Sequence, residues 1–407
     1  MKFSRKLKSM DHSPIRKFYK YAEDAKNKGK KVYHLNIGQP DIKTPDVFIN
    51  AIKNFADEIV AYMPSQGIPE LITQIRKYYE RHDVFFDDEN IIITNGGSEA
   101  LTFTLLSITN EGDEIIVPEP YYSNYNIFIK GTGAKIVPIT TRAENGFHFA
   151  REEEIENRIT KRTKAILLTN PGNPTGTVLT LKEMRMIADV AKKHNIFIIS
   201  DEVYREFVYN GTPVTSFGQL PDVTDRVILI DSVSKRFSAC GARIGALLTK
   251  NEELLDHVLK LCQGRLSCST LDMVGAAELY KLPHTYFNDI KKEYQKRRDI
   301  VYDILSPIEG VVCRKPSGAF YLTVKLPVDN AEEFLVWMLT SFDIDNETVM
   351  FAPIEGFYET PGLGKDEIRL AYVLNEKDLT KAMCILKAGL EKYRLLTCDD
   401  WDKKTEK

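Results

Sequence analysis

Short apolar runs alternate with helical patterns through the middle of the chain, between about residue 90 and residue 250. Apolar residues follow one another without interruption in these runs, which is typical of strands covered on both faces of a parallel sheet. We therefore predict an α/β domain with a central, mostly parallel sheet. Its strands are expected near residues 91–94, 114–117, 134–137, 165–168, 196–199, 227–230 and 246–248, with a helix over 181–194.

The pattern changes after about residue 270. A long helical stretch is predicted from roughly 270 to 306, and shorter strand-like and helical pieces follow it, including 319–322 and 367–370. These pieces indicate a smaller α+β unit, which the N-terminal segment is expected to join. A chain of 407 residues is long enough for two domains. The expected division is a large cofactor-binding domain over 46–290 and a small domain made of 1–45 and 291–407.

Charge and composition exclude several classes of function. A net charge of −3 gives no general attraction to nucleic acid or to an anionic membrane. The sequence has no apolar run of signal-peptide or membrane-span length, so a cytoplasmic protein is expected. The six cysteines form no C-x-x-C pair, and the histidines lack metal-ligand spacing, so no metal site is expected.

Lys235 is the most informative residue. It follows the predicted strand 227–230, with Ser232 and Ser234 just before it and Arg243 eight residues after it. A lysine amine forms a Schiff base with an aldehyde, and hydroxyl and guanidinium groups bind a phosphate. This arrangement favours a covalently held, phosphorylated cofactor.

Asp201 supplies the second part of such a site, because it follows the predicted strand 196–199. A buried carboxylate beside a pyridine nitrogen keeps that nitrogen protonated, so that the ring can withdraw electrons from a substrate. A Schiff-base lysine and a ring-pairing acid together indicate pyridoxal 5′-phosphate. Tyr204, and Asn173 in the turn 170–176, are the candidates to donate to the phenolic oxygen of the ring.

A glycine pair opens another predicted helix directly after a strand. The free backbone N–H groups at Gly96, Gly97 and Ser98 would form an anion site together with the helix dipole. With the serines and the arginine near Lys235, they would complete a phosphate cradle. Ligands bind at the carboxyl ends of strands in open α/β sheets, so Gly96, Asn170, Asp201 and Lys235 are expected at one edge of the sheet.

On these residues the chain resembles the class I/II pyridoxal-phosphate-dependent aminotransferases of the aspartate aminotransferase superfamily, which have fold type I. The resemblance covers nearly the whole chain, with the motifs in the family's order. The matching motifs are N-I-G-Q-P-D at 36–41, Y-M-P-S-Q-G at 62–67, G-G-S-E-A at 96–100, P-Y-Y at 120–122, N-P-G-N-P-T-G at 170–176, D-E-V-Y at 201–204, S-V-S-K at 232–235, G-A-R-I-G at 241–245 and I-R-L at 368–370.

The resemblance implies further roles. Tyr122 would stack on the cofactor ring. Tyr62 would reach the phosphate held by the neighbouring subunit, which implies a homodimer with shared active sites. Arg369 would hold the substrate α-carboxylate in a two-pronged salt bridge, a geometry that suits arginine and not lysine. Gly38 would approach the same carboxylate with its backbone, on a segment that moves when substrate binds.

The implied reaction moves an amino group between an L-α-amino acid (aspartate, aromatic or other) and a 2-oxo acid, with 2-oxoglutarate as the expected acceptor. The freed amine of Lys235 would act as the general base, and two successive half-reactions would give ping-pong kinetics. A lyase of the same fold, of the carbon–sulfur β-lyase or aminocyclopropane-carboxylate synthase type, would share every cofactor residue. A non-catalytic regulatory protein is a third reading, which the retained lysine disfavours.

The preferred amino donor stays open. Ser98 stands where some aspartate-specific bacterial relatives carry a lysine that meets the distal carboxylate. Arg265 either reads a distal carboxylate or forms a structural ion pair. Tyr121, Tyr125 and Tyr321 suit aromatic substrates equally well.

Overall fold

A central sheet of seven strands organises the computed structural model, which describes residues 3–8, 10, 12–148, 151–213 and 215–405, with side chains as far as Leu396 except that of Arg5. The strand order is β2-β8-β7-β6-β5-β3-β4. Strand β8 runs antiparallel to β2 and β7, and the other neighbouring pairs are parallel. The predicted α/β fold with a mostly parallel sheet is thus confirmed. The strands are β2 (Ile91–Thr94), β3 (Glu114–Glu119), β4 (Lys135–Thr140), β5 (Thr163–Thr169), β6 (Phe197–Asp201), β7 (Val227–Ser232) and β8 (Gly245–Leu248).

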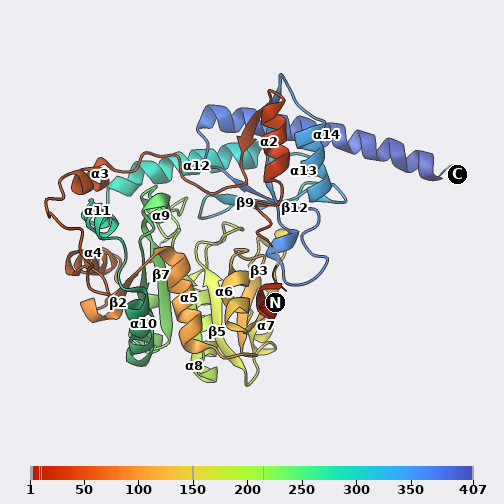
Figure 1. Cartoon of the computed structure of the whole chain (residues 1–407). Coiled ribbons are helices and arrows are strands. Elements are labelled where there is room, and N and C mark those ends of the chain that lie inside the picture. The colour runs from red at the N-terminus through yellow and green to blue at the C-terminus, as the bar shows by residue number, and fades with distance from the viewer. Residues whose placement is uncertain (1–2, 9, 11, 149–150, 214, 406–407) are drawn as a thin grey trace.

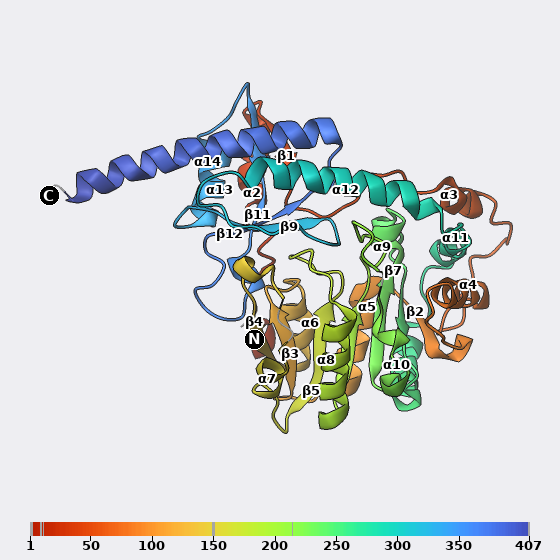
Figure 2. The same ribbon diagram turned by 180° about the vertical axis from the view of Figure 1, so that it is seen from behind.

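Helices cover both faces of this sheet, with α5 and α6 in front of it in Figure 1 and α8 in front of it in Figure 2. Successive residues of β7 therefore enter different cores: Leu229 packs with α4, α8 and α11, and Ile230 packs with α5, α6 and α10. All six residues of β7 are buried, which explains the uninterrupted apolar run in the sequence. The helices are α4 (Pro69–Glu80), α5 (Gly96–Ile108), α6 (Tyr125–Thr132), α8 (Leu181–His194), α10 (Glu252–Arg265) and α11 (Thr270–Tyr280).

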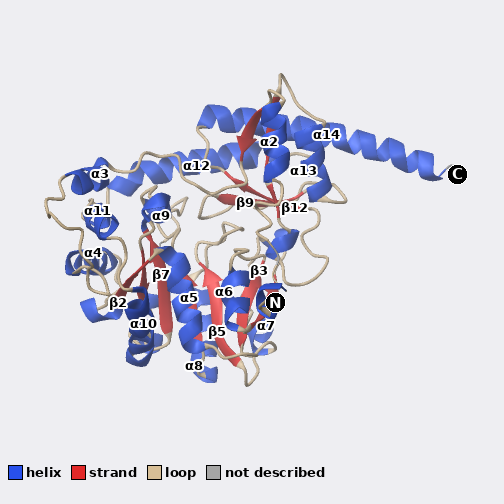
Figure 3. Ribbon diagram, in the orientation of Figure 1, coloured by secondary structure: helices blue, strands red, loops and turns tan. Residues whose placement is uncertain are grey.

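A second core lies above the carboxyl edge of the large sheet in Figure 3. The N-terminal strand β1 pairs in parallel with β10, and β12 pairs antiparallel with both β9 and β11. Apolar residues of α2, α12, α13 and α14 pack around these strands. The elements are α2 (Tyr19–Asn27), β1 (Lys31–His34), α12 (Tyr286–Leu305), β9 (Tyr321–Lys325), α13 (Ala331–Thr340), β10 (Glu347–Met350), β11 (Ala352–Pro353), β12 (Glu367–Ala371) and α14 (Glu376–Thr405).

The helical stretch predicted over 270–306 consists of two helices, α11 and α12, with a break between them. Pro283 lies in this break, and its ring and missing N–H prevent a continuous helix. Helix α12 also spans the predicted domain boundary at residue 290: Phe287 packs in the core of the large sheet and Tyr294 packs in the second core. The division into 46–290 against 1–45 and 291–407 stays a prediction.

The remaining elements are short. They are α1 (Arg5–Lys8), α3 (Asp46–Lys53), α7 (Glu152–Glu156) and α9 (Val233–Arg236), with the 3-10 helices η1 (Asp88–Asn90), η2 (Ala143–Asn145), η3 (Phe217–Gln219), η4 (Pro221–Val223), η5 (Cys240–Ala242) and η6 (Glu355–Phe357). Within the described part of the chain, no helix combines the length and the hydrophobicity needed to cross a membrane.

Candidate functional site

The carboxyl ends of β5, β6 and β7 lie at one edge of the large sheet because these strands are parallel neighbours. The carboxyl end of β2 lies at the same edge, because Gly245 of β8 pairs with both Thr94 and Ser232. A cavity of about 530 Å³ opens at this edge. It also reaches residues of the second core, so both parts of the chain contribute to its wall. The predicted site residues that line it are Gly38, Gly97, Ser98, Tyr122, Asn173, Asp201, Tyr204, Ser232, Ser234, Lys235, Arg243 and Arg369.

Lys235 lies on the single-turn helix α9, which follows β7 directly. Its Nζ atom donates a hydrogen bond of 2.9 Å to the carbonyl oxygen of Gly38, so the amine already faces the segment that borders the other side of the cavity. The next residue, Arg236, forms a fully buried ion pair of 2.6 Å with Asp231. Because this pair joins the end of β7 to the end of α9, it fixes the turn that presents the Lys235 amine.

Asp201 ends β6 and is 5% exposed. The hydroxyl of Tyr125 donates a hydrogen bond of 2.9 Å to its Oδ2 atom, and the backbone N–H of Val203 donates to Oδ1 over 3.4 Å. Burial raises the pKa of Asp201 to about 6. A positive charge placed next to this carboxylate would lower the pKa and keep the group ionised.

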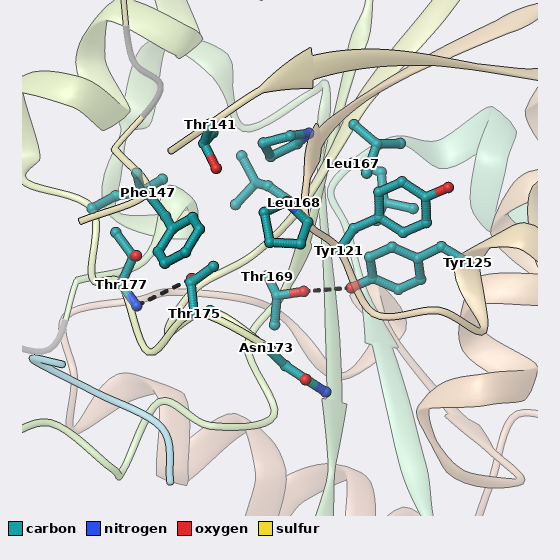
Figure 4. A pocket seen from close by; sticks show the side chains of 15 residues that line it. Tyr121, Tyr125, Thr141, Phe147, Leu167, Leu168, Thr169, Asn173, Thr175 and Thr177 are labelled. Carbon is teal, nitrogen blue, oxygen red and sulfur yellow. Dashed lines mark hydrogen bonds between the residues drawn. The ribbon is translucent and has the colours of Figure 1, made fainter. Parts of the chain in front are cut away.

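Tyr125 is itself held in place. Its hydroxyl lies 2.6 Å from Oγ1 of Thr169, the last residue of β5. Figure 4 shows this contact at the wall of a smaller cavity of about 40 Å³, with Asn173 beyond it. The acid is therefore fixed by neighbours from α6 and β5 as well as by its own strand.

At one end of the cavity, the backbone at the start of α5 forms a cradle. Helix α5 begins at Gly96, whose φ of +73° is readily available to glycine. A Cβ atom on Gly245 would lie 2.5 Å from the carbonyl carbon of Gly96 and 2.7 Å from the Gly97 nitrogen, so only glycine fits there. The exposed N–H groups at the start of α5 suit an anion.

Hydroxyl and guanidinium groups complete this cradle. The Ser232 hydroxyl donates to the Ser234 hydroxyl over 2.7 Å, and both side chains are buried at the cavity wall. Arg243 has a φ of +54°, in the left-handed region that non-glycine residues rarely adopt. Such backbone conformations cost of order 1–3 kcal/mol and are concentrated at ligand sites. The chemistry of these donors fits a bound phosphate.

Arg369 of β12 is a buried cation that lines the same cavity, and it is 2% exposed. Its guanidinium donates to Oδ1 of Asn173 over 3.1 Å and to the carbonyl oxygen of Asn36 over 2.5 Å. Its Nε atom has no hydrogen-bond partner among the described residues. A buried N–H of this kind would be satisfied by a carboxylate ligand.

Asn173 connects this arginine to the tyrosines of the site. Its Nδ2 atom donates to the Tyr204 hydroxyl over 3.4 Å, and that hydroxyl lies 2.9 Å from the hydroxyl of Tyr321. A Cβ atom on Gly38 would overlap the Tyr321 hydroxyl, so the backbone at Gly38 approaches the cavity closely. Burial raises the pKa of Tyr122, which also lines the cavity, to about 12.

Tyr62, Arg265 and Asn170 are among the predicted residues that lie away from the cavity wall. Tyr62 is 80% exposed. Arg265 forms an ion pair of 3.4 Å with Glu99 and donates to the carbonyl oxygen of Ile93, which agrees with the structural alternative of the two considered for it. Asn170 is buried and accepts a hydrogen bond from the backbone N–H of Leu179, so it stabilises the turn that carries Asn173.

The structure gives Tyr125, which the sequence named only as suited to aromatic substrates, a different contact, and it adds Arg16, to which the sequence assigned no role. The Tyr125 hydroxyl fixes Asp201, a contact that no spacing in the sequence indicates. Arg16 lines the cavity from the N-terminal segment. Tyr321 was expected near a substrate, and the structure adds its contact with Tyr204.

Comparisons with known proteins agree with this architecture. Residues 30–385 match the family model described as aminotransferase class I and II. The aspartate aminotransferase of Musicola paradisiaca is 32% identical over 381 residues, which cover 90% of this chain and 91% of that protein. The solved alanine aminotransferase from Pyrococcus furiosus has a TM-score of 0.88 and 30% identity, covering 96% of this chain and 100% of that one. The aromatic aminotransferase from Pyrococcus horikoshii has a TM-score of 0.82 and 26% identity, covering 92% and 100%. The chain belongs to the class I and II aminotransferases.

Proposed function

We propose that this aminotransferase binds pyridoxal 5′-phosphate in the cavity, covalently at Lys235. It would move an amino group from an L-α-amino acid to a 2-oxo acid, with 2-oxoglutarate as an acceptor, in a ping-pong sequence. The observation that supports this most is that one cavity contains an amine, a buried carboxylate, a glycine cradle and a buried guanidinium. Each of these groups has a distinct task in the proposed reaction.

The residues present fit the cofactor. Gly97, Ser98, Ser232, Ser234 and Arg243 would hold its phosphate, since they offer backbone N–H, hydroxyl and guanidinium donors at one end of the cavity. Asp201 would pair with its ring nitrogen, and the stacking surface would come from Tyr122. Tyr204 and Asn173 would donate to its phenolic oxygen. When bound, the cofactor supplies an electron sink for the α-carbon of the substrate.

The protein's own groups would then orient the substrate and move one proton. Arg369 and Asn173 would hold the α-carboxylate, because they are already hydrogen-bonded to each other at the cavity wall. The backbone at Gly38 would approach the same carboxylate. The Nζ atom of Lys235, once released from the cofactor, would take the proton from the α-carbon as a general base.

The proposal includes a homodimer with shared active sites and a cytoplasmic location. Tyr62 is 80% exposed, and its neighbours Ile59 and Val60 are exposed as well. This segment is tied to α11, because the Thr270 hydroxyl donates to the carbonyl oxygen of Ala61 over 2.9 Å. An anchored segment with exposed apolar residues suits contact with a second copy, in which Tyr62 would reach the neighbouring phosphate.

Separate half-reactions test the proposed function. Purified enzyme loaded with pyridoxal phosphate is mixed with L-aspartate, L-alanine or L-phenylalanine alone, and its absorption spectrum is recorded. At least one amino acid should remove the absorption band of the lysine-bound cofactor and release its 2-oxo acid, and 2-oxoglutarate should then restore the band. Steady release of a 2-oxo acid and ammonia without any 2-oxo acid acceptor would instead identify a lyase.

A further inference from the structure

Two histidines and a glutamate come together outside the cavity that contains Lys235. His82 follows α4, Glu206 follows β6, and His284 lies in the break between α11 and α12. Each side chain offers one ligand atom, and these three atoms lie within 4.8 Å of one another. Figure 2 shows α4 and α11 side by side, with the start of α12 close to α11. No metal site was expected from the sequence, because the three residues are far apart in it and only packing joins them.

His82 offers a buried nitrogen without a hydrogen-bond partner. Its side chain is 10% exposed, and within the described residues its Nε2 atom forms no hydrogen bond. Nε2 lies 3.3 Å from the Oε1 atom of Glu206, but the two atoms are not aligned as a hydrogen bond. Buried polar atoms in folded proteins are usually satisfied, so this nitrogen is available to a ligand.

The spacing of the ligand atoms suits one zinc ion. Zinc binds histidine nitrogen and carboxylate oxygen at ~2.0–2.2 Å, so two ligand atoms of a tetrahedral ion lie ~3.3–3.5 Å apart. The 3.3 Å between His82 Nε2 and Glu206 Oε1 has this value. The third atom, from His284, lies within 4.8 Å of both, so a small rotation of its side chain completes the set.

Glu206 is held in place from two other sides. It is 1% exposed, and the Tyr78 hydroxyl donates to its Oε1 atom. The Nζ atom of Lys291 forms an ion pair of 3.0 Å with its Oε2 atom. A carboxylate that binds a metal is normally held by such donors in an outer shell, which orient it toward the ion. Glu206 is therefore oriented before any ion binds.

His284 closes the cluster on the solvent side. It is exposed, and its ring lies 5.3 Å from the His82 ring at an angle of 71°. Within the described chain, its side chain forms no hydrogen bond and no ion pair, so it has no such contact to break. An exposed third ligand gives an ion a path from solvent and leaves room for a water molecule as the fourth ligand.

We infer that His82, Glu206 and His284 bind one zinc ion per chain, at a structural site separate from the active site. Imidazole with carboxylate suits Zn²⁺, whereas Mg²⁺ prefers oxygen ligands alone. The ion would tie α4 and the turn before α12 to the segment that carries Asp201 and Tyr204. Because the three ligands come together only in the folded chain, zinc would stabilise the fold.

Zinc titration of the loaded enzyme by calorimetry tests this inference. Bound metal is first removed with a chelator, and no amino acid is added, because amino acids bind zinc themselves. The parent should bind one zinc ion per chain at this site. His284→Gln should weaken that binding at least ~10-fold, since loss of an outer-shell partner alone costs ~10–100-fold.

His148→Gln is the matched control. His148 is also exposed, and its Nδ1 atom lies 2.8 Å from a carboxylate oxygen of Glu183. Within the described residues, this pair has no third metal ligand. The control should bind zinc as tightly as the parent. Both variants should perform the half-reactions at the parental rate, because neither histidine lines the cavity, and this result shows that they are folded.

Thermal unfolding and X-ray absorption give readouts that do not depend on the titration. Zinc should raise the Tm of the parent and of His148→Gln, and it should not raise that of His284→Gln. Mg²⁺ at the same concentration should raise none of them. The absorption spectrum of the zinc-bound parent should show nitrogen and oxygen ligands at ~2.0–2.2 Å.

Three results would overturn the zinc site. They are a parent that binds no zinc, equal zinc affinity in the parent and His284→Gln, and a sulfur ligand at ~2.3 Å, which would place the ion on a cysteine.

Discussion

The Tyr125 hydroxyl donates a hydrogen bond of 2.9 Å to the Oδ2 atom of Asp201, at the buried end of β6. This contact joins α6 to the acid that we expect beside the cofactor ring. It leaves the carboxylate in a desolvated position where its charge depends on a nearby cation. Asp201 is therefore the residue at which cofactor binding, catalysis and stability should be most closely linked.

Asp201→Ala should lower kcat by several orders of magnitude at saturating cofactor, because the ring nitrogen would lose its partner charge. Each tenfold step in rate corresponds to about 1.4 kcal/mol of activation free energy. Steady-state rates at several cofactor concentrations separate this effect from weaker cofactor binding. If the variant kept a near-parental kcat, Asp201 would not be the partner of the ring nitrogen.

Asp201→Asn should make the cofactor-free protein more stable at neutral pH. Burial raises the pKa of Asp201 to about 6, and the value in an unfolded chain is about 3.9. The contribution of protonated Asp201 to the free energy of unfolding is thus fully present below about pH 4 and is lost as the pH rises through about 6. Asparagine stays neutral. Between pH 4 and pH 8 the unfolding free energy of the variant should therefore rise by ~2–3 kcal/mol relative to that of the parent.

Urea unfolding of both proteins at pH 4, 6 and 8 measures this difference. The gain of Asp201→Asn over the parent should grow with pH. A difference that is constant across the three values, or that shrinks as the pH rises, would show that Asp201 is not buried as a raised-pKa acid.

Arg369→Lys should lower kcat/KM to the same extent for all amino-acid substrates. Lysine keeps the charge but cannot make the two-pronged bridge to the α-carboxylate, so kcat/KM should fall ~10–100-fold for each substrate. The kinetics of aspartate, alanine and phenylalanine provide the comparison. A loss restricted to aspartate would place Arg369 at the distal carboxylate and not at the α-carboxylate.

Mixed dimers test the shared-site proposal. Chains carrying Tyr62→Phe and chains carrying Lys235→Ala should each have low activity as pure dimers. If Tyr62 serves the neighbouring phosphate, a heterodimer has one site with both residues intact, so refolding the two chains together should restore measurable activity. A fully active monomer in sedimentation experiments would contradict this part of the proposal.

The sheet and most of its ligand edge could be predicted because the signals are local. Uninterrupted apolar runs mark the buried strands, and residues such as Asp201 and Lys235 follow these runs directly. Parallel strands then bring such residues to one edge without any further information. The break between α11 and α12 also has a local signal, because Pro283 lies in it and a proline disfavours a continuous helix.

What could not be predicted depends on packing between distant segments. Arg16 reaches the cavity because Phe18 is buried in the second core and Pro14 packs on Gly356, contacts that no local pattern encodes. The role of Arg265 depends on its ion pair with Glu99, a contact between α10 and α5 that no local pattern encodes. The role proposed for Tyr62 involves a second copy of the chain, and in the single chain Tyr62 is exposed.

The most direct test of the account is the identity of the lysine that holds the cofactor. Borohydride reduction of the loaded enzyme fixes the cofactor to its lysine, and digestion with mass spectrometry then locates the label. The account predicts one labelled peptide, with the label on Lys235, and no labelled peptide from Lys235→Ala treated in the same way. A label on a different lysine, or equal labelling of the parent and the variant, would contradict it.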